Sequence, residues 1–288
     1  MQEIAIERNR SGRPHQGKVF AAVHAHLADV PYFAGGLCAK LMAEGYTGYL
    51  IRTTNDETSG GQSAAQNILS NETEHFAMAK AVGFRDVFDL YYLSHRMNEI
   101  SPVELRGRLI FLFRMLQADT VLSYSPSPEG EPDSDRWITG RAVEEAARSA
   151  GGANDFHEHA EAGILPRAVR ERYYFYARPG QPFNQVVDIG AYVGTKIDAM
   201  VECRSQGNGN AGSLLRARLA KEGRRLALLG ENDRTADRAY ARRFLLEEFR
   251  AYAAGHDFEY AERFDYIGPP EDLSVEIEDY IAKNAIRI

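Results

Sequence analysis

The order of strand-like and helix-like segments predicts an α/β fold with a mostly parallel sheet and helices on both faces. Two apolar segments, Val19–Val23 and Gly48–Arg52, have the composition of buried strands. Between them, Phe33–Glu44 places Leu37 and Leu41 on one helical stripe. This is a strand-helix-strand unit, and the same alternation continues along the chain, which is typical of parallel sheets covered on both sides.

The remaining elements follow from the same two periodicities. Short β-branched or aromatic runs predict further strands at Val87–Leu90, Thr120–Tyr124, Tyr173–Tyr176 and Val186–Ile189. The helix over Pro102–Leu116 is strongly periodic and begins with Ser101 as N-cap. Helical spacing also predicts helices at Gln66–Val82, Arg141–Ala150, Tyr192–Arg204, Ala211–Gly223 and Thr235–Ala254.

The polar segments Ser125–Asp135 and Gln206–Gly212 are expected to be loops, and both are too short for inter-domain linkers. We therefore expect residues 1–288 to form a single domain whose C-terminal part, from about residue 207, is helical. The arginine- and glutamate-rich helices of that part could serve self-association, so a homo-oligomer is a possible state.

Composition favours small-molecule chemistry. The 288 residues are 44% hydrophobic and 26% charged, which is ordinary for a globular protein, and the formal net charge is −7. Because the arginines are spread along the chain, no basic surface of the kind that nucleic-acid binding needs is predicted. The expected partner is therefore a small molecule and not a nucleic acid.

The cysteine count and hydropathy indicate a reducing, aqueous environment. Cys38 and Cys203 are the two cysteines, and packed thiols are favoured over a disulfide or a cysteine zinc site. No signal-peptide pattern or membrane-spanning apolar run is present in the sequence. We expect a soluble cytoplasmic protein without membrane contact.

Three polar loops follow predicted strands: His26–Pro31, Thr53–Gly61 and Ser125–Arg136. Ligands of open α/β sheets bind beyond the carboxyl ends of the strands, so these loops are the candidate site. From spacing alone, His26 could instead be a strand-end histidine and Asp29 a helix cap.

The combined order of several motifs is more specific. The segments are Ala25-His26-Leu27-Ala28-Asp29, Gly35-Gly36-Leu37-Cys38-Ala39-Lys40-Leu41, Thr54-Asn55-Asp56-Glu57 and Gln117-Ala118-Asp119-Thr120-Val121. In this order they resemble the LmbE / PIG-L family of zinc-dependent N-deacetylases, over roughly Val19 to Gln206. The resemblance implies a Rossmann-like fold and hydrolysis of an acetamide, usually on an amino sugar.

The resemblance also implies a metal site that this sequence alters. His26 and Asp29 fall on two metal-ligand positions, but the position of the general base is Ala28, which accepts no proton. Without a gap, Asp133 and Asp135 fall within the second motif and Arg136 on the third ligand position. Guanidinium has no lone pair for a metal, whereas a one-residue slip would bring Asp135 there instead.

Two readings follow from these replacements. The first is a hydrolase with a rearranged metal site or a different base, for which zinc stays an open cofactor. The second is a non-catalytic member that binds a carbohydrate-like or anionic molecule. In either case Arg136 could neutralise Asp29 in the space of an absent ion, or it could face solvent.

Other residues have less specific signals. Arg52, Asn55 and Asp56 end the second strand, where they could bind substrate together with Arg136, and Trp137 could stack on a sugar ring. His157 and His159 could supply an alternative zinc ligand, although a solvated loop is favoured for them. For His24, a core position is favoured over the pocket wall.

Overall fold

The computed structural model describes residues 4–269 and 274–286. In this part of the chain eight strands form one sheet, in the order β1-β7-β8-β6-β5-β2-β3-β4. Their bounds are β1 Ala5–Glu7, β2 Val19–His24, β3 Thr47–Thr54, β4 Asp86–Tyr92, β5 Thr120–Tyr124, β6 Glu171–Phe175, β7 Gln185–Asp188 and β8 Ala261–Ile267. All neighbours run parallel except β8, which is antiparallel to β6 and β7. The predicted mostly parallel α/β fold is confirmed.

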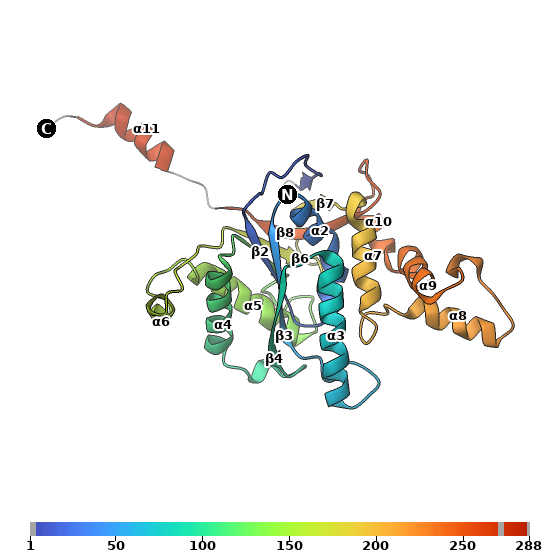
Figure 1. Ribbon diagram of the computed structural model, residues 1–288. Coiled ribbons are helices and arrows are strands. Elements are labelled where there is room, and N and C mark those ends of the chain that lie inside the picture. Colours follow the sequence, from blue (N-terminus) through green and yellow to red (C-terminus); the bar gives the residue numbers. More distant parts are fainter. Residues whose placement is uncertain (1–3, 270–273, 287–288) are drawn as a thin grey trace.

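Helices cover both faces of the sheet (Figure 1). The α-helices are α1 Asp29–Phe33, α2 Gly35–Ala43, α3 Ala64–Val82, α4 Pro102–Leu116, α5 Ser134–Ser149, α6 His157–Glu161, α7 Val193–Glu202, α8 Ala211–Lys221, α9 Asp233–Tyr240, α10 Glu247–Tyr252 and α11 Ser274–Asn284. Short 3-10 turns lie at Met97–Glu99, Gly190–Tyr192 and Ala227–Leu229, and a π-helical turn lies at Ala241–Leu245.

Alternate residues of β2 serve two cores because successive strand side chains point to opposite faces. Phe20 and Ala22 pack into the core formed with α2, α3 and α7, whereas Ala21 and Val23 pack into the core formed with α4 and α5. β2 is thus buried on both faces, which explains its continuous apolar sequence.

Local signals set helix bounds where they are strong. α4 begins and ends at the predicted residues, because the Ser101 hydroxyl accepts from the Glu104 backbone N–H and Pro102 takes the first position. α3 ends at Val82, and the next residue, Gly83, closes the helix in the left-handed conformation with a φ of 103°.

The structure differs from the prediction near the N-terminus, at α5 and in the C-terminal third. β8 lies within the segment expected to be helical, and β1 precedes the first predicted strand. The predicted helix Thr235–Ala254 is divided by the π-helical turn, and α5 begins at Ser134 rather than Arg141. β8 was missed because polar residues alternate with its aromatic ones in Ala261–Ile267, which hides its burial.

Cys38 and Cys203 are free, fully buried thiols, as expected. Burial raises the pKa of both thiols well above the ordinary value. No helix within the described residues is both long and apolar enough to cross a membrane.

Candidate functional site

The predicted polar loops meet at the carboxyl ends of the central strands. β2 pairs in parallel with β3 on one side and with β5 on the other, so the residues that follow these strands lie at one edge of the sheet. The segment from Ala25 to Asp29 follows β2, Asn55 and Asp56 follow β3, and the loop to Asp133 follows β5.

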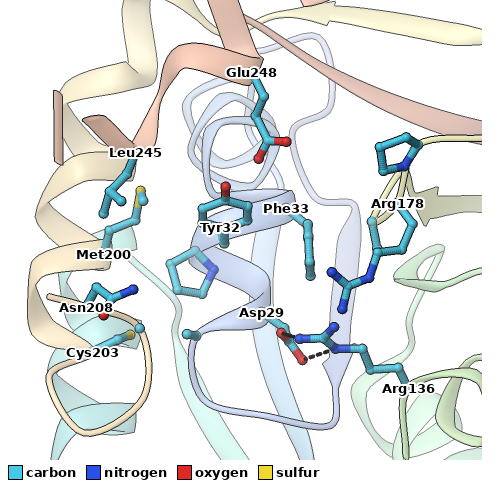
Figure 2. A pocket seen from close by; sticks show the side chains of 15 residues that line it. Asp29, Tyr32, Phe33, Arg136, Arg178, Met200, Cys203, Asn208, Leu245 and Glu248 are labelled. Carbon is cyan, nitrogen blue, oxygen red and sulfur yellow. Dashed lines mark hydrogen bonds and ion pairs between the residues drawn. The ribbon is translucent and has the colours of Figure 1, made fainter. Parts of the chain in front are cut away.

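Arg136 forms a two-pronged ion pair with Asp29 (Figure 2). Its Nη2 lies 2.7 Å from Oδ1 of Asp29, and its Nε lies 3.2 Å from Oδ2. Oδ2 also accepts from the Tyr124 hydroxyl and, at 3.3 Å, from the backbone N–H of His26. The Asp29 side chain is only 5% exposed, so the guanidinium replaces water as its partner. The ion pair considered from the sequence is therefore present.

Ala28 precedes α1 and lines a cavity next to this pair. Its backbone N–H donates to Oε1 of Gln206 at 3.2 Å. Gly207 approaches so closely that a Cβ placed there would lie 2.8 Å from the Cβ of Ala28. The methyl group of Ala28 can neither accept nor donate a proton.

His26 lies between carboxylates. Its Nδ1 is 2.8 Å from Oδ1 of Asp56, and its Nε2 is 3.1 Å from Oδ2 of Asp133 and 3.7 Å from Oδ2 of Asp135. Burial by itself lowers the pKa of His26, but the hydrogen bonds to Asp133 and Asp56 outweigh it and raise this pKa well above 6.5. Burial opposes ionisation of Asp133 too, yet His26 holds the pKa of that carboxyl at about 2. The structure thus favours a charged imidazolium bridging two carboxylates.

Asp135 is completely buried, and its oxygens accept backbone N–H groups of His95 and Met97. His95 has a φ of 61°, which is unusual for a residue other than glycine, and its ring centroid lies 5.9 Å from that of His26. Sequence reasoning missed His95, because its only local signal is a histidine in a polar connector after β4.

A buried polar network supports Asp56 and His26 from beneath. Arg52 is fully buried and contacts Asp89 through Nε at 2.8 Å and Asp56 through Nη1 at 3.4 Å. His24 pairs with His75 at 3.0 Å between their Nε2 atoms, which places His24 in the core, as favoured. Because Arg52 has no exposed surface, it orients Asp56 and does not reach a ligand.

The cavity beside the ion pair has a volume of about 400 Å³. Figure 2 shows Tyr32 and Phe33 in its middle, Glu248 on one side and the guanidinium groups of Arg136 and Arg178 on the other. The lining residues are Ala28, Asp29, Pro31, Tyr32, Phe33, Arg136, Ala177, Arg178, Pro179, Met200, Cys203, Gly207, Asn208, Leu245 and Glu248.

A buried lysine holds the cavity wall in place. Lys196 of α7 donates from Nζ to the backbone carbonyls of Pro31 and Tyr32 and lies 2.8 Å from Oε1 of Glu262. Glu262, on β8, also accepts the backbone N–H groups of Gly36 and Leu37 at the start of α2. A carboxylate at a helix N-terminus is favourable, so one buried acid fixes both α2 and the lysine.

Several sequence-predicted residues lie apart from the cavity. Trp137 lines a separate hollow between α4 and α5, and Asn55 is largely buried, with its Oδ1 accepting from the Glu57 backbone. His159 contacts Arg114 and the Phe156 ring, and His157 is exposed on the same short helix α6. None of the four lines the cavity that Arg136 borders.

Zinc, which the sequence resemblance implies, does not fit the donor set His26, Asp29 and Arg136. Arg136 offers no lone pair, and both oxygens of Asp29 already accept hydrogen bonds. A second set consists of His26, Asp133 and Asp135, which present ligand atoms within 4.8 Å of one another. Of these three residues His26 and Asp135 are buried and Asp133 is partly exposed, and the group could hold a metal ion.

Residues 21–147 match the model of the PIG-L family, described as GlcNAc-PI de-N-acetylase. This segment of the chain is similar to the PIG-L family. The matched region includes His26, Ala28, Asp29 and Arg136, so the replaced positions lie inside the family's own segment. No curated protein matches this chain.

Solved structures share the fold of this chain. N,N'-diacetylchitobiose deacetylase from Pyrococcus horikoshii is 19% identical with a TM-score of 0.68, over 87% of this chain and 84% of that one. A conserved protein from Thermus thermophilus, TT1542, is 18% identical with a TM-score of 0.63, over 88% and 96%. GalB, the 4-carboxy-2-hydroxymuconate hydratase from Pseudomonas putida KT2440, is 19% identical with a TM-score of 0.62, over 88% and 98%. At these identities the likeness establishes the fold alone.

Proposed function

We propose that this protein is a non-hydrolytic PIG-L family member that binds a small sugar-type molecule in the cavity beside Arg136. The observation that carries the proposal is the two-pronged ion pair between Arg136 and Asp29. A permanently charged guanidinium there already neutralises the carboxylate that the family resemblance assigns to a metal ion.

The missing base points the same way. Hydrolysis of an acetamide needs a water molecule that is polarised and then deprotonated, and a positioned base contributes about 10²–10⁴ to such a rate. Ala28 has no proton-accepting group, and His26 is held between Asp56 and Asp133. The Asp56 carboxylate is fully buried, so it orients His26 rather than reaching a substrate.

Sugar-type ligands are supported by the lining of the cavity and by the relatives. The faces of Tyr32 and Phe33 can pack on a sugar ring, while Glu248, Asn208 and Arg178 can bind hydroxyl groups. The family description names a GlcNAc compound, and one structural neighbour is named a diacetylchitobiose deacetylase. An N-acetylated sugar is accordingly the first ligand to test.

A rearranged hydrolase is the second candidate, and the close grouping of His26, Asp133 and Asp135 favours it. A metal ion there could lower the pKa of a bound water molecule without involving Asp29. Asp133 and His26 would then bind the ion together with Asp135, and the ion pair of Arg136 would stay intact.

Elemental analysis and calorimetric titration test the proposal together. After dialysis against a weak chelator, we expect zinc well below one ion per chain, binding of N-acetylglucosamine and no release of acetate. Asp133→Asn is the discriminating variant, since it should leave the metal content unchanged if the protein is metal-free. Stoichiometric zinc that falls with Asp133→Asn, together with acetate release, would establish the rearranged hydrolase instead.

A further inference from the structure

Among the described residues that line the cavity, Arg178 carries a guanidinium whose one ion pair, with Glu131, is long. Its side chain is 42% exposed, and its nearest acid is Glu131, at 3.6 Å from Nε to Oε2. Within the described residues neither of these two atoms has a hydrogen-bond partner. Arg136 differs, because its two hydrogen bonds to Asp29 already engage it.

The backbone around Arg178 is well defined. Gln181 accepts through Oε1 from the backbone N–H groups of Ala177 at 2.9 Å and Arg178 at 3.0 Å. The hydroxyl of Tyr176 accepts from the backbone N–H of Gly180, whose φ of 95° completes the turn. Hydrogen bonds from Ala177 and Arg178 to Gln181, and from Gly180 to Tyr176, therefore hold the loop that carries Arg178 after β6.

Figure 2 shows the Arg178 guanidinium extending toward Phe33 and Arg136, on the side of the cavity away from Glu248. Glu248 accepts from the Tyr252 hydroxyl at 3.2 Å. The cavity thus has a donor-rich end at Arg178 and an acceptor at Glu248. A ligand that matches both ends carries an anionic group at one side and hydroxyl or amino donors at the other.

We infer that the ligand is an anionic sugar, bearing a carboxylate or a phosphate that Arg178 binds. This inference rests on the proposed function and narrows its ligand class. A guanidinium offers five N–H donors in a planar fork that matches either group. Glu131 does not block this role, because its side chain is only 2% exposed and it also lies 3.6 Å from Nη1 of Arg136.

The test is calorimetric titration of the full chain at low ionic strength with three probes. They are N-acetylglucosamine, N-acetylglucosamine 6-phosphate and N-acetylmuramic acid, which are neutral, phosphorylated and carboxylated. Wild type should bind at least one anionic probe about tenfold or more tightly than the neutral one. The tighter of the two anionic probes identifies the group.

Arg178→Gln should abolish the anion preference, so that the anionic probes bind the variant no more tightly than N-acetylglucosamine does. Arg141→Gln is the matched control, since Arg141 is 67% exposed on α5 and does not line this cavity. Thermal melts would verify that both variants fold.

Each outcome decides one of the two ideas. Equal affinities for all probes in wild type, or a preference that survives Arg178→Gln, would overturn the inference and leave the proposed function standing. Bound zinc with acetate release would overturn the proposed function, and the same titrations would still decide the role of Arg178. No binding of any probe would overturn both.

Discussion

Replacing Arg136 by methionine tests whether the guanidinium stabilises the fold in place of an ion. The change removes hydrogen bonds of 2.7 and 3.2 Å and leaves the Asp29 carboxylate, 5% exposed, with the Tyr124 hydroxyl and the His26 backbone N–H. Losing one partner of a buried pair costs about 3–5 kcal/mol. Because two donors remain, we expect the lower end, about 3 kcal/mol of unfolding free energy.

A double-mutant cycle with Asp29→Asn isolates the pair. The double variant should lose less stability than the two single variants together, with a coupling energy of about 1–2 kcal/mol. Urea unfolding followed by circular dichroism gives the free energies. The control Arg141→Met, which removes an exposed pair with Glu145, should change stability by less than about 0.5 kcal/mol. Additive losses, or an Arg136→Met variant that behaves like the control, would refute the assigned role.

Three further predictions use other parts of the site. Arg136→His should raise zinc content, but only the double variant with Ala28→Asp should also release acetate from N-acetylated amino sugars. Unfolding free energies of wild type and His26→Gln, measured between about pH 6 and 9, test the charged state of His26. The extra stability of wild type should be fully present below pH 6.5, the pKa of histidine in the unfolded chain, and should be lost as the pH rises through the raised pKa of His26 in the folded protein. Lys196→Met should cost about 3 kcal/mol in urea unfolding, because the buried carboxylate of Glu262 loses its cation and keeps only the backbone N–H groups of Gly36 and Leu37. An unchanged midpoint would contradict this.

Strands of the sheet could be predicted where their burial shows as an apolar run in the sequence. β2 and β5 are buried on both faces, so their apolar sequences predicted strands close to the observed bounds. β8 gave no such trace, since it carries Glu262 inward to meet Lys196 and its other polar residues alternate with aromatics. The ion pair between Glu262 and Lys196 is a tertiary contact, so the local sequence of β8 did not indicate that the strand is buried.

Part of the site followed from motif order, and part from contacts across the chain. The placement of Arg136 beside Asp29 was considered from the sequence, because both fall on positions of one family motif set. Arg178 and Gln206 come from loops without a motif, and only the folded structure brings them to Ala28 and the cavity. Arg52 was expected at the ligand, but its burial follows from its pairing with Asp89.

The bridge from Glu262 to Gly36 and Leu37 joins residues more than two hundred positions apart in the sequence. During synthesis the first strand-helix-strand unit therefore leaves the ribosome long before its acidic partner exists. Until β8 inserts between β6 and β7, the amides at the start of α2 and the ammonium group of Lys196 lack the carboxylate that they later share. Completion of the cavity wall is consequently a late folding event, since such distant contacts carry the largest loop-closure cost.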